Sequence, residues 1–321
     1  MRPQASEWVR LSAALGLGRL TQIRLAARGS THIVFKASTD HRAYAVRVPR
    51  TIPLAKRAQF SQRKNDLWVL AATQGIGPRY FGTQRLVVGS LRLHVSVTEW
   101  LDGRPFDPVH DARRLGETLA RLHSQTYAVP GSNQKAVDLG EFLERWLDRQ
   151  RRGMPPTALG EMLSQRLRGA QASLNAGTRR HDPMACLVHN DLVSQNVMVC
   201  KGQLRLIDWD WAMWTNPVMD LFCYLSPFVR SWERPFSLPR PAVARFLRSY
   251  RVSADARVIT AARRGLDLWG AYNCGAAGWL YAEAPVRRRH FASRAFHEWA
   301  FGEAAKLAAP LREGLGAEMA P

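Results

Sequence analysis

The sequence has little that would suit a membrane or an oxidising compartment. No apolar run approaches the roughly 20 residues that a membrane-spanning helix needs. The first residues read as a short amphipathic helix and lack the apolar core and cleavage site of a signal peptide. Cysteine is scarce, and no C-x-x-C pair occurs among the four cysteines, Cys186, Cys200, Cys223 and Cys274. Such scattered cysteines favour reduced core thiols over disulfides or a zinc site. We therefore expect a cytoplasmic protein without a membrane partner.

Lysine is also scarce, although the chain is strongly basic. Only six of the 46 basic residues are lysine, and with 26 acidic residues the formal net charge is +20. This charge raises the possibility of nucleic-acid binding. The arginine excess is spread from end to end, however, and no helix-turn-helix, zinc-finger or RNP motif accompanies it. We attribute it to an arginine-rich composition and expect no nucleic-acid partner. Nothing in the sequence indicates the oligomeric state.

Periodicity predicts two lobes of different composition. Near-alternating apolar residues predict strands at 20–27, 32–39, 43–49 and 91–101, interrupted by one helix at about 54–73. From Pro105 onward the apolar spacing becomes helical, and it places Leu115, Leu119 and Leu122 on one helix face. We expect an α+β fold in which residues 1–98 form a small lobe with an antiparallel sheet. Residues 99–321 then form a large helical lobe.

The stretch LVHNDLVSQNVMVCKGQLRLIDWDWA, residues 187–212, places polar side chains beside apolar, strand-like segments. It reads as a loop, a strand, a glycine-containing turn and a second strand. Such a hairpin brings the loop at Asp191 and Asn196 beside the strand end at Asp208. Converging hard oxygen ligands of this kind suit Mg²⁺. Asp and Asn residues that only cap turns are the alternative interpretation.

The spacing within this stretch is typical of phosphoryl transfer. His189, Asp191 and Asn196 fill the pattern H-x-D-x-x-x-x-N, in which the Asp is the base and the Asn binds metal. Asp208 takes the place of the second metal-binding Asp, on a following strand. We predict that Asp191 and His189 are catalytic and that Asn196 and Asp208 hold Mg²⁺.

With these motifs the chain resembles the aminoglycoside phosphotransferase and choline/thiamine kinase family, which has a protein-kinase-like fold. The segment LARLH (119–123) is similar to the family's helix before the catalytic loop. The segment NPVMDLFCY is similar to the family's segment after the metal-binding Asp, and this similarity implies that Asp220 braces the catalytic loop. The segment CGAAGWLYAEA is similar to a late helix of the family. The resemblance implies a two-lobed kinase-like fold and ATP with Mg²⁺ as cofactors.

The resemblance also implies a phosphate-covering loop at ARGSTHIVFKA. This segment has no G-x-G-x-x-G, but Gly29, Ser30 and Thr31 are candidate donors to phosphate oxygens.

Arg47 in YAVRVP occupies the position of the strand-three lysine, and we expect it to grip the nucleotide phosphates and to pair with Asp66. A strand Arg with no ligand is the alternative. The hinge TEWLDG then supplies the backbone groups of Glu99 and Leu101 to adenine.

The acceptor is expected to be a small molecule, because the stretch between Asp208 and Asp220 is too short for a regulated activation loop. Asn190 also stands where protein kinases have an Arg that docks a phosphorylated loop. A choline- or thiamine-like cation would need aromatic and acidic groups. The candidates for this role are Asp210, Trp211, Asp267, Trp269, Trp279 and Glu283.

These aromatic residues could equally belong to the core. The alternatives to a cationic acceptor are an aminoglycoside or macrolide, and the basic charge itself favours an anionic acceptor. A non-catalytic basic binding protein on a kinase-like scaffold is an alternative of another class.

Overall fold

The computed structural model describes residues 3–29, 32–50, 58–88, 91–127, 136–176, 185–231, 234–283 and 289–316. The chain divides into two compact units. Unit 1 comprises Met1–Arg104 and Arg205–Asp210, and unit 2 comprises Pro105–Leu204 and Trp211–Pro321. The chain therefore returns to unit 1 for six residues, and these include Asp208.

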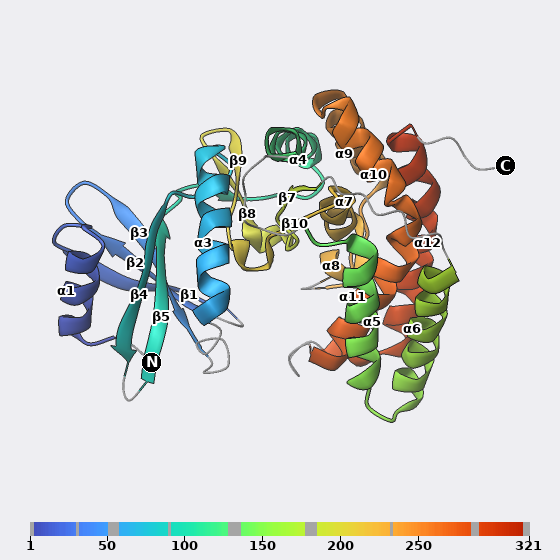
Figure 1. Cartoon of the computed structure of the whole chain (residues 1–321), viewed down its shortest axis with the longest axis horizontal. Coiled ribbons are helices and arrows are strands. Elements are labelled where there is room, and N and C mark those ends of the chain that lie inside the picture. Colours follow the sequence, from blue (N-terminus) through green and yellow to red (C-terminus); the bar gives the residue numbers. More distant parts are fainter. Residues whose placement is uncertain are drawn as a thin grey trace. The chain divides into compact units, whose positions relative to one another are not determined.

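Unit 1 is built on a five-stranded antiparallel sheet of order β1-β2-β3-β5-β4. Its strands are β1 (Gln22–Arg28), β2 (His32–Ser38), β3 (Ala43–Pro49), β4 (Tyr80–Val88) and β5 (Leu91–Glu99), and its helices are α1 (Ala5–Ala14) and α3 (Ala58–Thr73). The small antiparallel sheet is as expected, whereas β4 had no counterpart in the sequence prediction. Figure 1 shows α1 and α3 beside this sheet.

The two faces of the sheet serve different purposes, because side chains alternate along each strand. One face forms the apolar core of unit 1, where Trp8 of α1 packs edge-on against Phe35 of β2, with ring centroids 5.4 Å apart. Val46 and Val48 of β3 belong to this core, so Arg47 between them lies on the opposite face. There its guanidinium carbon is 5.0 Å from the ring centroid of Trp68 in α3. Because side chains alternate along β3, Arg47 is buried on the sheet face opposite the apolar core.

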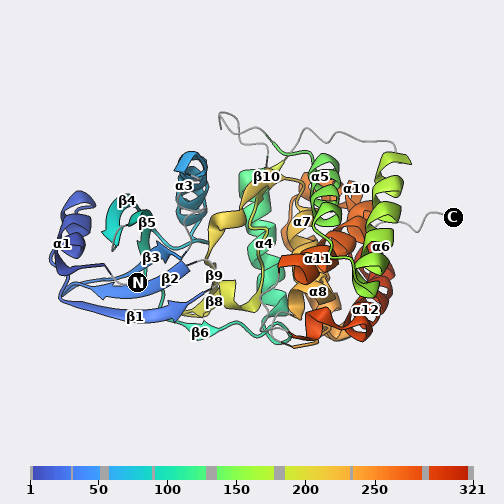
Figure 2. The same ribbon diagram turned by 90° about the horizontal axis from the view of Figure 1, so that it is seen from below.

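Unit 2 is mainly helical, as expected. Its helices are α4 (Ala112–Thr126), α5 (Leu139–Arg152), α6 (Ala158–Ala176), α7 (Val218–Leu225), α8 (Pro227–Arg230), α9 (Arg240–Ser253), α10 (Ala256–Arg264), α11 (Trp269–Glu283) and α12 (Arg294–Gly314). Helices α5, α6 and α11 pack side by side (Figure 2). Strand β7 (Cys186–Val188) pairs antiparallel with β10 (Met213–Thr215). None of the described helices is long and apolar enough to cross a membrane.

The chain passes between the units at one further short strand and at a hairpin. Strand β6 (Arg104–Pro105) lies at the first crossing. The expected hairpin is formed by β8 (Val197–Cys200) and β9 (Gln203–Leu206), neighbours in their small sheet. Its turn is made by Lys201 and Gly202, which have φ values of 49° and 79°. Glycine adopts such positive φ values without the steric penalty that other residues meet.

Helices α4 and α9 pack closely against each other in unit 2. Leu115, Leu119 and Leu122 form the predicted apolar face of α4 and are fully buried. The close approach depends on Gly116, because a Cβ there would lie 2.5 Å from the Phe246 carbonyl oxygen of α9. This packing fixes the end of α4, and with it the side chains of that end.

Candidate active site

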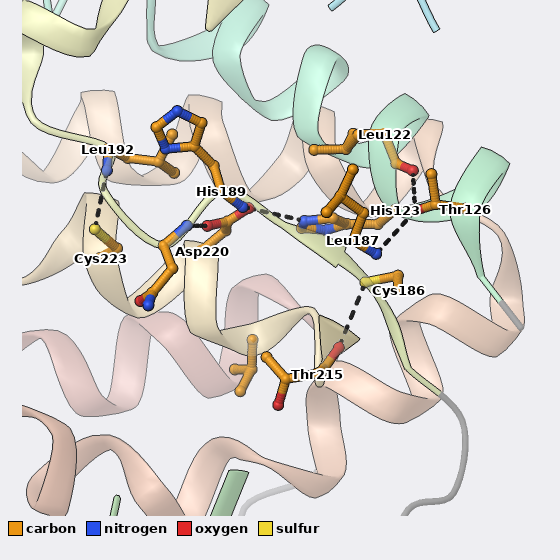
Figure 3. A network of polar contacts seen from close by, with 12 residues as sticks. Leu122, His123, Thr126, Cys186, Leu187, His189, Leu192, Thr215, Asp220 and Cys223 are labelled. Atoms are coloured by element: carbon orange, nitrogen blue, oxygen red, sulfur yellow. Dashed lines mark hydrogen bonds and ion pairs between the residues drawn. The ribbon is translucent and has the colours of Figure 1, made fainter. Parts of the chain in front are cut away.

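The backbone of the candidate catalytic loop is held by one buried carboxylate. Strand β7 leads into the loop, which ends in the turn η1 (Ser194–Asn196). Asp220 of α7 accepts hydrogen bonds from the backbone N–H of His189 at 2.9 Å and of Asn190 at 2.7 Å (Figure 3). Asn190 has a φ of 59°, a conformation that non-glycine residues adopt rarely and only when the surroundings hold it. The bracing role expected of Asp220 is confirmed.

Behind Asp220 lies a second buried layer. The His123 Nε2 atom is 3.1 Å from Asp220 Oδ2, and its Nδ1 atom is 2.8 Å from the Tyr250 hydroxyl. Because a carboxylate can only accept, a neutral His123 carries its proton on Nε2 and accepts from Tyr250. His123, Asp220 and Tyr250 are fully buried. The network therefore joins α4, α7 and α9 to the loop.

Within the loop, Asn196 fixes the carboxylate of Asp191. Its Nδ2 donates to Asp191 Oδ2 at 2.7 Å and to the Asp191 carbonyl oxygen at 3.0 Å. The Asp191 N–H in turn donates to His189 Nδ1 at 3.2 Å. The His189 side chain is fully buried, so in this structure it positions the backbone of Asp191. The amide oxygen of Asn196 is the atom that could ligate a cation.

Two further contacts anchor the loop and the strand that leads into it. The Leu192 N–H points at the sulfur of Cys223 in α7, 3.1 Å away, and the Leu187 N–H donates to Thr126 Oγ1 at 3.0 Å (Figure 3). Burial raises the pKa of the Cys223 thiol to about 12, so this sulfur is a neutral thiol and not a nucleophile. None of the four cysteines forms a disulfide.

In unit 1, Arg47 is paired with two carboxylates of the segment after β9. Its Nη2 donates to Asp208 Oδ1 at 2.7 Å and to Asp210 Oδ2 at 3.1 Å. His32 Nδ1 lies 3.4 Å from the same nitrogen. Asp208 and Asp210 raise the pKa of Arg47 and outweigh desolvation, which acts the other way. The guanidinium is therefore fixed as a cation.

This arrangement corrects the expected partner of Arg47. We expected Asp66 of α3, but Asp66 is exposed and the ion pairs of Arg47 are with Asp208 and Asp210. The physical reason is that the Asp side chain on α3 is short, whereas the segment Asp208–Asp210 places two carboxylates within hydrogen-bond distance of the guanidinium.

The position of Asp208 depends on the fully buried Trp209. Asp208 has a φ of 65°, again in the left-handed region. Trp209 donates from Nε1 to the Leu206 carbonyl oxygen at 2.8 Å, and Leu206 N–H donates to the Ile76 carbonyl oxygen at 2.8 Å. Gly77 makes room for the indole, because a Cβ there would lie 3.1 Å from Trp209 Nε1. The buried tryptophan thus holds an unfavourable backbone conformation that aims the carboxylate.

The donor set fits a nucleotide phosphate and a divalent cation. Arg47 Nη1 is buried and has no hydrogen-bond partner among the described residues. A phosphate oxygen is the kind of acceptor that a buried guanidinium N–H needs. Asp208 in unit 1 and Asn196 in unit 2 each carry an oxygen atom of the kind that Mg²⁺ prefers. No group of three or more His, Cys, Asp or Glu residues that could hold a metal occurs in the described part of the chain.

The remaining nucleotide-binding candidates lie around the sheet of unit 1. Gly29 is in the β1–β2 turn, where its N–H donates to the His32 carbonyl oxygen at 2.8 Å. Ser30 and Thr31 lie outside the described residues. At the hinge, the Glu99 N–H donates to the Arg79 carbonyl oxygen at 2.7 Å, so it is used within unit 1. The Glu99 carbonyl and the Leu101 backbone remain the candidate groups for adenine.

The residues expected to form a cationic-acceptor pocket are not brought together as one. Trp269 is buried, donates from Nε1 to the Ala304 carbonyl oxygen at 2.9 Å and packs on Phe222. Asp267 is paired with Arg312 at 2.7 Å on the surface, with 81% of its side chain exposed.

The other members of the set differ as well. Trp279 is half-buried against an apolar cluster of unit 2. Asp210 belongs to the Arg47 cluster, and the side chain of Glu283 lies outside the described residues. Only Trp211 is an exposed aromatic residue next to the loop, where its carbonyl oxygen accepts from Asn190 Nδ2 at 3.3 Å.

The chain belongs to the phosphotransferase enzyme family, whose model matches residues 22–268. The match covers the loop of Asp191, the Arg47 cluster and Asp220. The protein is therefore a phosphotransferase that uses ATP and has an alcohol group as acceptor. This confirms the family inferred from the motifs.

Solved structures agree on the fold. The chain is similar to a choline kinase from Cryptosporidium parvum, with a TM-score of 0.60, 13% identity, and coverage of 91% of this chain and 89% of that one. An amicoumacin kinase in complex with AMP-PNP and Ca²⁺ gives 0.62 and 15%, with 95% and 94% covered. A spectinomycin phosphotransferase in complex with ADP and spectinomycin gives 0.56 and 12%, with 98% and 100% covered. These likenesses support the two-lobed kinase-like fold. No curated protein matches the chain.

Proposed function

We propose that the protein transfers the γ-phosphoryl group of ATP to a hydroxyl group of a small molecule, with Asp191 as the base. The observation that carries the proposal is that hydrogen bonds fix the position of the Asp191 carboxylate. Asn196 fixes its carboxylate at 2.7 Å, and the loop that bears both is fixed by Asp220. A base must be positioned before its proton affinity matters, since a displacement of about 1 Å can lower a rate by two orders of magnitude.

The assigned roles follow from the atoms. Asn196 orients Asp191 by donating to its Oδ2, and we assign the Asp191 carboxylate to the acceptor hydroxyl. As the acceptor oxygen bonds to the γ-phosphorus, its proton passes to Asp191, the bond to the bridging oxygen breaks, and ADP leaves. Asn196 and Asp208 would hold Mg²⁺, which supplies charge neutralisation to the phosphates when bound. Arg47, with one unpartnered buried nitrogen, would contact the nucleotide phosphates.

The acceptor classes raised by the sequence were a choline- or thiamine-like alcohol and an aminoglycoside or macrolide. Support for a cationic alcohol is weakened by the core position of Trp269 and the surface ion pair of Asp267. Without aromatic faces and carboxylates around it, a bound cation has no interactions to replace the hydration that it loses. The family match supports a small-molecule acceptor of either kind.

The test is ADP formation by the purified chain. The panel contains choline, ethanolamine, thiamine, aminoglycosides, macrolides, sugars and hydroxy acids, each with ATP and Mg²⁺. We expect turnover with at least one compound and a loss of about two to four orders of magnitude in Asp191→Asn. Asp148→Asn is the matched control, because Asp148 forms surface ion pairs on α5 that are worth little. Wild-type turnover in Asp191→Asn would refute the assignment. Salt-dependent nucleic-acid binding without turnover would favour the non-catalytic alternative.

A further inference from the structure

Arg230, the last residue of α8, is buried against the catalytic loop. Its exposed fraction is 8%, and its Nη1 donates to the hydroxyl of Ser194 at 3.3 Å. Ser194 opens the turn that ends at Asn196, the residue that fixes Asp191. All of these residues belong to unit 2. The guanidinium therefore lies beside the loop that carries the base.

Among the described residues, this guanidinium has no anionic hydrogen-bond partner. Its Nε and Nη2 atoms are buried and make no hydrogen bond with the described residues. The groups around it are the ring of Tyr224, with its centroid 5.3 Å from the guanidinium carbon, and Cys223, Tyr272 and Asp191. Of these only Asp191 is a carboxylate, and burial raises the pKa values of Cys223, Tyr224 and Tyr272, so these three groups are neutral.

A buried cation in this state is unusual. Desolvation lowers the pKa of Arg230, yet a guanidinium keeps its proton in proteins. Buried charges are normally paired, and buried donors normally have an acceptor. The Nε–H and Nη2–H groups of a planar guanidinium match the geometry of two oxygen atoms of a carboxylate or a phosphate. An oxyanion would satisfy both N–H groups and the charge at once.

We propose that Arg230 binds an anionic group, a carboxylate or a phosphate, on the acceptor molecule while Asp191 faces its hydroxyl. The inference rests on the proposed function and names its acceptor class. It replaces the cationic alcohol expected from the sequence with an anionic one. The overall charge of +20 points the same way, because it attracts anions to the molecule and repels cations.

The position of Arg230 also restricts the acceptor. Arg230 contacts Ser194, three positions after Asp191 in the same tight loop, and the charge of Asp191 acts on the guanidinium. Because Arg230 and Asp191 adjoin the same loop, we expect the anionic group and the reacting hydroxyl to lie close together in the acceptor. A short hydroxy acid or a hydroxyalkyl phosphate meets this condition. Arg47, in unit 1, is the guanidinium that we assign to the nucleotide.

The first arm of the test compares Arg230→Gln and Arg230→Lys with Arg168→Gln. Arg168 is exposed on α6, so its variant removes the same charge away from the loop. The acceptors are hydroxy acids from glycolate to 6-hydroxyhexanoate, each paired with its primary amide. For an accepted acid we expect Arg230→Gln to raise KM about 10- to 100-fold, with the KM for ATP unchanged. Arg230→Lys should recover part of the loss, since it keeps the charge but not the fork. The KM for the matching amide and all constants of Arg168→Gln should be unchanged.

The second arm does not depend on turnover. The buried Nε–H of Arg230 should give a separate ¹⁵N resonance, assigned by its loss in Arg230→Lys. Titration of the full chain with the acids or with inorganic phosphate should shift this resonance, and titration with the amides should not. If wild-type protein phosphorylates none of the compounds, the proposed function loses support while this arm still decides the anion site.

Two outcomes would overturn the inference. A resonance that neither the acids nor inorganic phosphate move would exclude an anion at Arg230. An equal fall in kcat for acids and amides in Arg230→Gln would instead assign Arg230 to the transferred phosphoryl group. Unfolding curves of both variants separate these effects from a general loss of structure.

Discussion

Replacing Asp220 by asparagine should destabilise the fold and disable the loop together. The carboxylate is fully buried and meets three N–H groups, from His189 at 2.9 Å, Asn190 at 2.7 Å and His123 at 3.1 Å. An asparagine side chain has nearly the same shape but only one acceptor oxygen. At least one of the three donors would then face an NH₂ group, and the other hydrogen bonds would lose their charge.

The magnitude follows from these contacts. A hydrogen bond to a charged group contributes about 1.5–3 kcal/mol, and a neutral one about 1 kcal/mol. Losing one charged bond and weakening the others gives a decrease of about 3–5 kcal/mol in the free energy of unfolding. This is a large part of the roughly 5–15 kcal/mol that stabilises a typical domain. Because His189 and Asn190 carry the backbone that leads to Asp191, kcat should fall at least about 100-fold.

Urea unfolding followed by tryptophan fluorescence measures the stability, and ADP formation measures kcat. Tyr250→Phe provides a milder change, because it removes only the hydroxyl 2.8 Å from His123 Nδ1, one step further from the loop. It should lower stability by about 1–2 kcal/mol and change kcat by less than about threefold. Tyr281→Phe is the matched control, since its hydroxyl bonds Thr157 at an exposed site. An Asp220→Asn variant with the wild-type urea midpoint and normal turnover would refute the bracing role.

Arg47→Ala should weaken ATP binding by about 1.5–3 kcal/mol in a nucleotide titration, because it removes a buried guanidinium with one nitrogen still to be paired. Unchanged affinity would rule the contact out. Asp208→Asn should raise the Mg²⁺ concentration needed for half-maximal rate, and a rate independent of divalent metal would contradict the ligand role. Cys223 should resist iodoacetamide at about pH 8, since its pKa of about 12 keeps it a neutral thiol, and it should react only after unfolding. Trp269→Phe should lower the melting temperature and leave the acceptor KM unchanged, whereas Trp211→Ala should raise that KM, provided that Trp211, exposed next to the loop, touches the acceptor.

The sequence predicted the local parts of the structure well. Spacing alone indicated the hairpin β8–β9 and the helical face of Leu115, Leu119 and Leu122, because both depend on residues close together in the chain. The resemblance to a known family added the role of Asp220. Strand β4 was missed because its middle, Gly82 to Arg85, is polar or lacks a side chain, and Gly82 has a φ of 140° in an irregular register.

Contacts between distant segments were beyond the sequence. The two partners of Arg47, Asp208 and Asp210, lie 161 and 163 positions after it in the chain. No sequence pattern distinguishes them from Asp66 as partners. The sequence offers Trp269 as a pocket residue, and its burial, its packing on Phe222 and its bond to the Ala304 carbonyl oxygen assign it to the core in the folded chain. Arg230 was one of many arginines, and its burial sets it apart only in the folded chain.

The buried network of the loop has a consequence for the order of synthesis. His189 and Asn190 depend on a carboxylate about 30 positions later, and His123 depends on a hydroxyl 127 positions later. A nascent chain that has emerged only as far as β9 carries every residue of the loop but not the groups that hold it. The site can thus acquire its geometry only after α7 and α9 have left the ribosome and packed on α4. Truncated products that end before Asp220 would carry the motif from His189 to Asp208 and still lack the carboxylate that holds the loop.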